Sequence, residues 1–224
     1  MKKDILKKIL DYNKKRIAVV HLVGLCNQID DLVLAGQTTG DKELDNEING
    51  CLKEDRSKLV NISGNDYFID VYNPPLKLII VGAVHIAQYL IEFAKKLGFE
   101  CILIDPREGF ASEDRFPDVK VLRNWPDEVL EQLDIDQRTA IVTLTHDPKI
   151  DDVALRFALN SSCFYIGSLG SKKTHSARIE RLNIDFDHKA LDKINAPIGL
   201  NIGARSPNEI ALSIISQIVS ELRT

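Results

Sequence analysis

The sequence predicts an α/β protein in which a smaller α+β domain precedes a doubly wound parallel sheet. Two observations favour this class. From residue 74 onward, short strands that are apolar on both faces alternate with single helical patterns, as in parallel sheets covered by helices. The chain has 224 residues, 44% of them hydrophobic and 28% charged, so it is large enough to bury such a core.

The boundary between the two domains is predicted at the segment NPPLK, residues 73–77. Two consecutive prolines cannot continue a helix and favour an extended connector. We therefore expect a small N-terminal domain over residues 1–73 and the α/β domain over residues 74–224. Within the first domain the pattern predicts a helix over about residues 2–15, a strand RIAVVHLV, a polar middle and a second strand YFIDVY.

The second domain shows strand and helix patterns in regular alternation. The expected strands are KLIIVG, ECILID, DVKVL, TAIVTLT and CFYIG, and the expected helices are HIAQYLIEFAKKLG, PDEVLEQL, DDVALRFAL and SPNEIALSIISQIVSEL. In the last helix, Ser206 is the expected N-cap, Pro207 the first helical residue and Glu209 the third position of a capping box. One face of that helix is predicted to pack on the sheet through Ala211, Ile214, Ile215, Ile218 and Leu222.

Charge and cysteine usage exclude several classes of protein. A net charge of −4 disfavours nucleic acid as the main partner, and no apolar run approaches the ~20 residues of a membrane span. Cys26, Cys51, Cys101 and Cys163 are widely spaced and form no C-x-x-C pair. We expect a cytoplasmic protein with neither a disulfide framework nor a metal site.

The turn after the first strand of the α/β domain resembles part of a dinucleotide fingerprint. Gly82, Ala83, Val84 and His85 follow four apolar residues, and Val84 takes the place of the second glycine. Asp105 lies 23 residues beyond Gly82, near the spacing at which an acidic residue binds a ribose diol. These features favour a nucleotide-like ligand, with a purely structural turn as the alternative.

Polar residues also follow the other strands, and ligands of open parallel sheets bind beyond the carboxyl ends of strands. Arg107 follows Asp105, and Thr145, His146 and Asp147 form a turn in which His146 and Asp147 are candidate catalytic residues. The same residues suit a plain turn, with Asp151 or Asp152 as the next N-cap.

The segment GSLGSKK, residues 167–173, joins a strand to a helix and predicts an anion site at the helix N-terminus. Its candidate binding residues are Gly167, Ser168, Gly170 and Ser171. Lys172 and Lys173 would strengthen such a site. His175 is expected on the solvated surface.

Taken together, the motifs VGAVHIAQYL, TLTHDPKIDD, YIGSLGSKK and INAPIGLNIGARSPNEIALSIISQIV strongly resemble the C-terminal Rossmann domain of the XdhC/CoxI family. The resemblance runs from about residue 76 to the end. The family's glycine turn reads G-A-G-H-V-A. Gly82, Ala83, His85 and Ala87 keep this pattern, and Val84 departs from it.

The resemblance implies a Rossmann-like fold and a maturation factor for molybdenum hydroxylases of the xanthine dehydrogenase type. Family members bind molybdenum cofactor (molybdopterin), help it acquire its terminal sulfur and deliver it to the apoenzyme. For this chain it implies a ligand surrounded by His85, Asp105, Arg107 and the turns 145–147 and 167–171. It also implies a homodimer, an apoenzyme partner and a cysteine desulfurase as a further partner.

The N-terminal domain resembles the family less closely. The family's motif G-G-G-C-x-E is represented here only by Gly50 and Cys51, and Cys51 is either a sulfur-handling thiol or a packed side chain. Two functions other than a non-catalytic accessory protein stay open: an NAD(P)-dependent oxidoreductase and a nucleotide-sensing regulatory module. Val84 counts against both, because a valine side chain would crowd the pyrophosphate.

Overall fold

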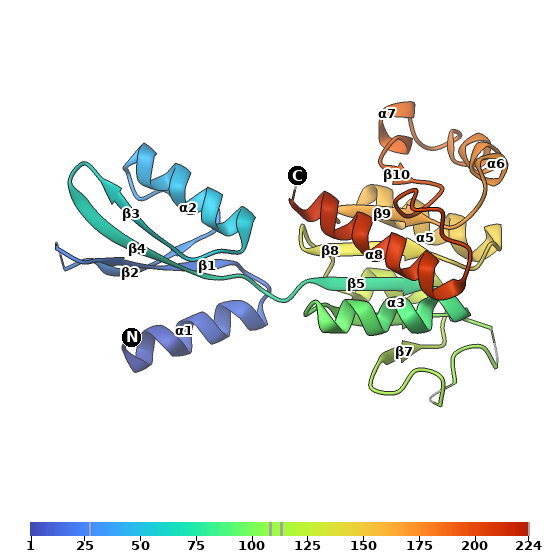
Figure 1. Ribbon diagram of the computed structural model, residues 1–224, viewed down its shortest axis with the longest axis horizontal. Coiled ribbons are helices and arrows are strands. Elements are labelled where there is room, and N and C mark those ends of the chain that lie inside the picture. Colours follow the sequence, from blue (N-terminus) through green and yellow to red (C-terminus); the bar gives the residue numbers. More distant parts are fainter. Residues whose placement is uncertain (27, 108, 113, 224) are drawn as a thin grey trace. The chain divides into compact units, whose positions relative to one another are not determined.

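The computed structural model describes residues 1–26, 28–107, 109–112 and 114–223. The chain forms two compact units, one made mainly by Met1–Pro75 and the other by Leu76–Leu222 (Figure 1). Each unit has its own hydrophobic core.

The first unit is a four-stranded antiparallel sheet, ordered β2-β1-β4-β3, with two helices. Its elements are α1 (Lys3–Lys14), β1 (Val19–Gly24), β2 (Asp30–Leu34), α2 (Lys42–Glu54), β3 (Lys58–Ile62) and β4 (Asn65–Tyr72). The edge strands β2 and β3 were not predicted as strands. Each buries only one or two side chains, so neither shows the apolar run that marks β1.

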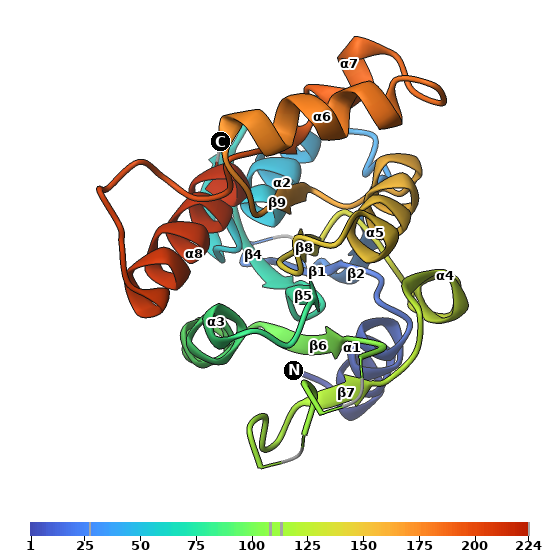
Figure 2. The ribbon, with the colours of Figure 1, turned by 90° about the vertical axis from the view of Figure 1, so that its right-hand side faces the viewer.

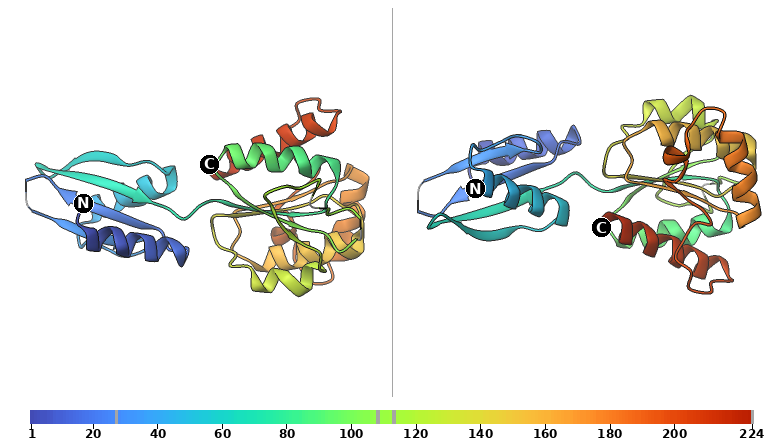
Figure 3. Two further views of the ribbon diagram at one scale, coloured as in Figure 1. Left: turned by 90° about the horizontal axis from the view of Figure 1, so that it is seen from below. Right: turned by 90° about the horizontal axis from the view of Figure 1, so that it is seen from above.

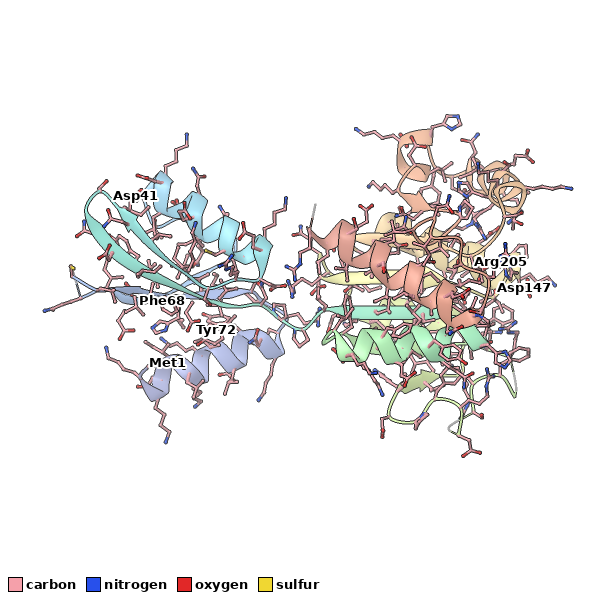
Figure 4. The ribbon with its side chains drawn as sticks, viewed as in Figure 1. Met1, Asp41, Phe68, Tyr72, Asp147 and Arg205 are labelled. Atoms are coloured by element: carbon pink, nitrogen blue, oxygen red, sulfur yellow. The ribbon has the colours of Figure 1, made fainter. Side chains whose placement is uncertain are left out.

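Helix α2 begins at its N-cap Asp41, which is labelled in Figure 4 and accepts hydrogen bonds from the amides of Glu43 and Leu44. Its apolar side packs on the sheet and includes Cys51, which is 3% exposed. Burial raises the pKa of the Cys51 thiol. The structure therefore favours a packing role for this side chain over thiolate chemistry.

The second unit is a six-stranded sheet ordered β10-β9-β8-β5-β6-β7, and every neighbouring pair is parallel. Numbered from its first strand, this is the order 3-2-1-4-5-6 of a doubly wound dinucleotide fold. The predicted fold class is confirmed. The strands are β5 (Lys77–Val81), β6 (Glu100–Ile104), β7 (Lys120–Leu122), β8 (Thr139–Thr143), β9 (Tyr165–Ser168) and β10 (Ile194–Asn195).

Helices cover both faces of this sheet, as Figures 2 and 3 show. One face packs on α3 (His85–Lys96) and α8 (Pro207–Arg223), the other on α4 (Pro126–Val129), the 3-10 turn η1 (Leu130–Gln132) and α5 (Pro148–Asn160). Helices α6 (Lys172–Leu182) and α7 (His188–Leu191) belong to the connection from β9 to β10. Because β5 leads into α3 and its neighbour β8 into α5, the chain leaves these strands toward opposite faces, and ligands of doubly wound sheets usually bind at such a switch point.

Helix α8 begins at Pro207 as predicted, and Glu209 Oε2 accepts hydrogen bonds from the amides of Arg205 and Ser206. Two other boundaries were wrong. Helix α5 begins at Pro148, since Asp147 and Pro148 serve as N-cap and first helical residue. Strand β9 extends through Ser168, and the short strand β10 was not predicted at all.

Candidate functional site

The glycine turn between β5 and α3 is shaped by a close approach of two strand ends. Gly82 has φ +121°, and a Cβ placed on it would lie 2.9 Å from Thr145 Cγ2 and 3.1 Å from the Thr145 amide nitrogen. Packing against Thr145 is therefore enough to require glycine at position 82. Val84 is the extended N-cap of α3 and makes no side-chain cap, and His85 is exposed in the first turn of the helix.

Asp105, at the end of β6, is buried completely and surrounded by donors. The Ala83 amide donates to Oδ2 at 2.7 Å and the Arg107 amide to Oδ1 at 3.0 Å. Arg107 adds a bidentate pair, Nε to Oδ1 at 2.9 Å and Nη2 to Oδ2 at 2.6 Å. This carboxylate fastens the β6 end to the glycine turn.

The pKa of Asp105 reflects these contacts. Burial raises it, but the hydrogen bonds from the Arg107 side chain and from the amides of Ala83 and Arg107 outweigh burial and hold it below the ordinary value. The carboxylate is therefore ionised and already accepts four hydrogen bonds. A ribose diol could form hydrogen bonds with the Asp105 carboxylate only by displacing Arg107. The Arg107 guanidinium is also in contact with Phe110, 4.2 Å from the centre of the ring.

The turn after β8 is held by a buried carboxylate that the sequence did not single out for this role. Asp151, which is 1% exposed, accepts from Thr145 Oγ1 at 2.6 Å, from the Thr145 amide at 3.3 Å and from the His146 amide at 3.0 Å. Burial, the largest influence, raises the pKa of Asp151 despite these bonds. The negative charges of Asp147 and Asp151 contribute to the raised pKa of Arg107, so the residues after β8 attract the arginine that follows β6.

His146 combines exposure with an unusual backbone. Its φ is +63°, in the left-handed region that costs non-glycine residues free energy, and its side chain is exposed. Asp147, labelled in Figure 4, is the N-cap of α5 and accepts from the Lys149 amide at 3.0 Å. Within the described residues no hydrogen bond joins the His146 ring to the Asp147 carboxylate. The local fold explains Asp147 and leaves the imidazole of His146 unexplained.

Gly167 and Ser168 lie inside β9 and are buried, whereas the sequence placed them in the turn. A Cβ on Gly167 would collide with the side chains of Ile198 and Tyr165, so packing explains this glycine. Ser168 Oγ and Thr143 Oγ1 are 2.6 Å apart and hydrogen-bonded in the interior.

The turn itself consists of Leu169, Gly170 and Ser171. Gly170 has φ +146°, and Ser171 is the N-cap of α6, accepting from the Thr174 amide at 3.2 Å. Lys172 and Lys173 are exposed, and their amides, the first two of the helix, have no acceptor within it. The turn therefore presents positive charge and free donors to solvent.

Arg178 is the functional candidate that sequence reasoning missed. It is 2% exposed, and its Nη2 donates to the Leu169 carbonyl at 3.0 Å. Thr174, Arg178 and Leu182 are spaced by four residues along α6 and so share one helical face, which ends at the buried Leu182. An arginine four residues before a leucine that the helix buries is the sequence signal that could have identified Arg178.

His175 is only half-exposed, which corrects the expectation of a solvated side chain. Burial, followed by the charge of Arg178, lowers the pKa of His175. In the part of the chain that the structure describes, no cluster of three or more His, Cys, Asp or Glu side chains could hold a metal ion. None of the described helices is both long and apolar enough to span a membrane.

The strand order 3-2-1-4-5-6, with a glycine turn at the β5 end and polar residues at the neighbouring strand ends, defines a Rossmann-type domain. Residues 78–218, more than half of the chain, match the family described as the XdhC Rossmann domain. The chain belongs to this family, and the predicted resemblance is confirmed.

Two curated relatives are similar to about two thirds of this chain. A protein of Bacillus subtilis, named as a probable xanthine dehydrogenase component, is 30% identical over 153 residues, which is 68% of this chain and 44% of that protein. The molybdenum cofactor insertion chaperone PaoD of Escherichia coli is 27% identical over 150 residues, 66% of this chain and 41% of that protein. The chain thus spans less than half the length of these relatives.

A solved structure resembles nearly the whole chain. A crystal structure described as a xanthine dehydrogenase from Bacillus halodurans aligns with a TM-score of 0.72 and 27% identity. The alignment covers 98% of this chain and 64% of that one.

Proposed function

We propose that this protein is a maturation factor that binds molybdenum cofactor as cargo and delivers it to an apoenzyme of the xanthine dehydrogenase type. Family membership supports the proposal, and one matched relative is named a molybdenum cofactor insertion chaperone. Because the chain spans under half of that relative, the activity of the whole relative is carried over here only as a proposal.

The observation that carries the proposal is the distribution of charge around the crevice. The Asp105 carboxylate is taken by Arg107 and by the Ala83 amide, so this group is not free to bind a ribose diol at the β6 end. The β9–α6 turn, in contrast, offers free amides, two exposed lysines and the buried Arg178. A pterin that carries a phosphate suits this donor set, whereas the ribose of a nicotinamide dinucleotide would find the Asp105 carboxylate already paired with Arg107.

The residues of the chain would bind, orient and shield the cargo. The amides at the α6 N-terminus would contact anionic groups, and the exposed imidazole of His146 would supply a donor or acceptor for polar ring atoms. A hydride-transfer enzyme would need a proton relay, and in the described residues His146 has no bond to Asp147 that would form one. This geometry favours binding over turnover.

The apoenzyme, a cysteine desulfurase and a second copy of the chain are the proposed partners. Relatives named for xanthine dehydrogenase and for cofactor insertion support the apoenzyme. The desulfurase, the homodimer and the cytoplasmic location stay predictions. The burial of Cys51 and the raised pKa of its thiol argue against Cys51 itself as a sulfur-handling thiol.

Isothermal titration of the purified chain with molybdenum cofactor, and in parallel with NADH and NADPH, tests the proposal. We expect micromolar binding of the pterin and at least tenfold weaker binding of either nicotinamide nucleotide. His146→Ala is expected to weaken pterin binding while the protein stays folded. Binding of NADH or NADPH alone would contradict the proposal and favour the oxidoreductase or the sensor.

Val84→Gly sharpens this comparison. If Val84 obstructs a pyrophosphate, the glycine variant gains affinity for a dinucleotide and keeps its affinity for the pterin. A gain for the pterin instead would assign the cargo's phosphate to the β5–α3 turn.

A further inference from the structure

Arg178 is a buried cation with incomplete hydrogen bonding. Its Nη2 donates to Leu169 O, whereas Nε and Nη1 are buried and have no hydrogen-bond partner among the described residues. A guanidinium cannot be neutralised near pH 7, so burial without full pairing is costly. Burial, the largest influence, lowers the pKa of Arg178, which reflects the same cost.

The nearest carboxylates do not pair with this guanidinium. Asp152 is taken by Arg181, whose Nε and Nη2 lie 2.5 Å and 3.0 Å from its two oxygens. Asp151 accepts its three hydrogen bonds from Thr145 and His146. Both carboxylates attract Arg178 electrostatically, but neither makes a hydrogen bond with it in the described contacts. The charge is compensated only in part.

The side chain of Arg178 also points toward the end of the helix that repels it. It runs from the middle of α6 back to the turn before the helix, where it reaches Leu169 O. A helix N-terminus carries about half a positive charge, and Lys172 and Lys173 add two more charges there. The helix N-terminus, the two lysines and the Arg178 guanidinium thus all bring positive charge to one turn.

Gly170 lets the turn pack closely against α6. A Cβ on Gly170 would lie 3.7 Å from Arg178 Nη2 and 3.1 Å from the Cβ of Thr174. The missing side chain therefore brings the turn against Thr174, with the Arg178 guanidinium directly behind it. A phosphate has the negative charge and the several acceptor oxygens that suit the two helix-terminal amides and the partly paired guanidinium.

We propose that the β9–α6 turn and Arg178 form an oxyanion subsite that binds the phosphate group of the ligand. The proposal deepens the proposed function and rests on it for the identity of the ligand. The amides of Lys172 and Lys173 donate to the phosphate from the first turn of α6. Arg178 compensates its charge from the protein side, and Gly170 keeps the turn close to the guanidinium.

The first test is isothermal titration of the full chain with inorganic phosphate and with pyrophosphate in a buffer free of both. Wild type should bind, and Arg178→Met should lose at least about tenfold in affinity. In the absence of phosphate Arg178→Met should also melt at a higher temperature, because an uncompensated buried charge is replaced by an apolar side chain of similar length.

A purely structural arginine predicts the opposite pattern. If Arg178 serves only to hold Leu169, Arg178→Met melts at a lower temperature and binds phosphate as wild type does. Unchanged phosphate affinity overturns the subsite, whichever way the melting temperature moves.

A surface variant keeps the test valid if Arg178→Met fails to fold. Lys172→Glu reverses a charge in the first turn of α6, and Lys189→Glu is the matched control, an exposed lysine in the first turn of α7. We expect Lys172→Glu to weaken phosphate binding about tenfold and Lys189→Glu to leave it within about twofold. Equal losses in both variants would mean non-specific attraction and overturn the subsite.

Titration of the same variants with molybdenum cofactor separates the two proposals. A parallel loss of cofactor and phosphate affinity in Arg178→Met supports both. Cofactor binding that is the same in wild type and Arg178→Met overturns the subsite and leaves the maturation role standing. Phosphate binding that depends on Arg178, in a chain that does not bind the cofactor, supports the subsite and contradicts the maturation role.

Discussion

Two strand-to-helix turns of the Rossmann unit, β5–α3 and β9–α6, differ in what pairs with their positive charge. At the β5–α3 turn the Ala83 amide donates to a carboxylate of the protein, Asp105, which Arg107 also holds. At the β9–α6 turn the amides of the first two helical residues have no acceptor among the described residues, and Arg178 beside them is only partly paired. One turn is complete within the protein, and the other has a buried guanidinium that is only partly paired.

The comparison teaches that the turn with the sequence fingerprint need not be the turn that binds the ligand. The sequence G-A-V-H marks the β5–α3 turn as the start of a Rossmann domain, and packing against Thr145 explains its glycine without a ligand. The turn at Gly170 has no such fingerprint, yet it has the features that anions require. The following predictions test this difference, from the largest expected effect to the smallest.

Gly82→Ala should give the largest loss of stability. The new Cβ combines a disfavoured φ of +121° with contacts of 2.9 and 3.1 Å to Thr145, so we expect a loss of about 3 kcal/mol in the free energy of unfolding. Gly98→Ala is the matched control, with φ +82° and nothing within 4 Å of the new Cβ, and should lose about 1 kcal/mol. Equal losses in urea denaturation would show that close packing at the β5 end has no role.

Asp105→Ala should lose about 2 kcal/mol, because it leaves the Ala83 amide and the Arg107 guanidinium without their acceptor. The exposed Asp192→Ala serves as control and should change stability by less than about 0.5 kcal/mol. Both are measured by urea denaturation at neutral pH. An Asp105→Ala variant as stable as the control would mean that Asp105 does not complete the β5–α3 turn.

Acid should weaken the protein partly through Asp105. Its folded-state pKa lies below the ordinary value of 3.8, so its stabilising contribution is present above that value and is lost as the pH falls through the lowered folded pKa. Asp151 acts in the opposite sense, since its raised pKa makes protonation favour the folded state. Between about pH 4 and about pH 2, thermal melts of Asp105→Asn should decline less than those of wild type. Parallel curves would contradict the charge assignment.

His146→Gly should have the smallest effect on stability, a gain of up to about 1 kcal/mol, because glycine adopts φ +63° without strain. The same variant should bind the ligand more weakly if the exposed imidazole contacts it. A gain in stability with unchanged ligand affinity would show that His146 has only a structural role in its turn. Urea denaturation and isothermal titration on one preparation supply both values.

Features set by neighbouring residues were predictable from the sequence. The α8 N-terminus at Pro207 follows from a capping box within four residues, and the apolar periodicity of α8 placed Ile214, Ile215 and Ile218 in the core. The alternation of apolar strands and helices indicated the parallel sheet. The hairpin between β3 and β4 was missed, although its two-residue turn, Ser63–Gly64, has the positive φ angles that such dipeptides favour.

Features that depend on distant partners were not predictable. One of the donors to the Asp105 carboxylate, the Ala83 amide, lies 22 residues earlier in the chain. The importance of Arg178 arises from what it lacks, because Asp152 pairs with Arg181 and Asp151 with the Thr145–His146 turn. Such a shortage of partners becomes visible only once the side chains have been brought together.

The central claim is that the anion belongs to the β9–α6 turn and not to the β5–α3 turn. The most direct test is a nitrogen-15 NMR titration of the full chain with inorganic phosphate, followed at backbone amides and at the arginine Nε–H groups. We predict saturable shifts at the amides of Lys172 and Lys173 and at Arg178 Nε, with Ala83 and His85 unmoved. Shifts at Ala83 and His85, with the amide signals of Lys172 and Lys173 unchanged, would contradict the account.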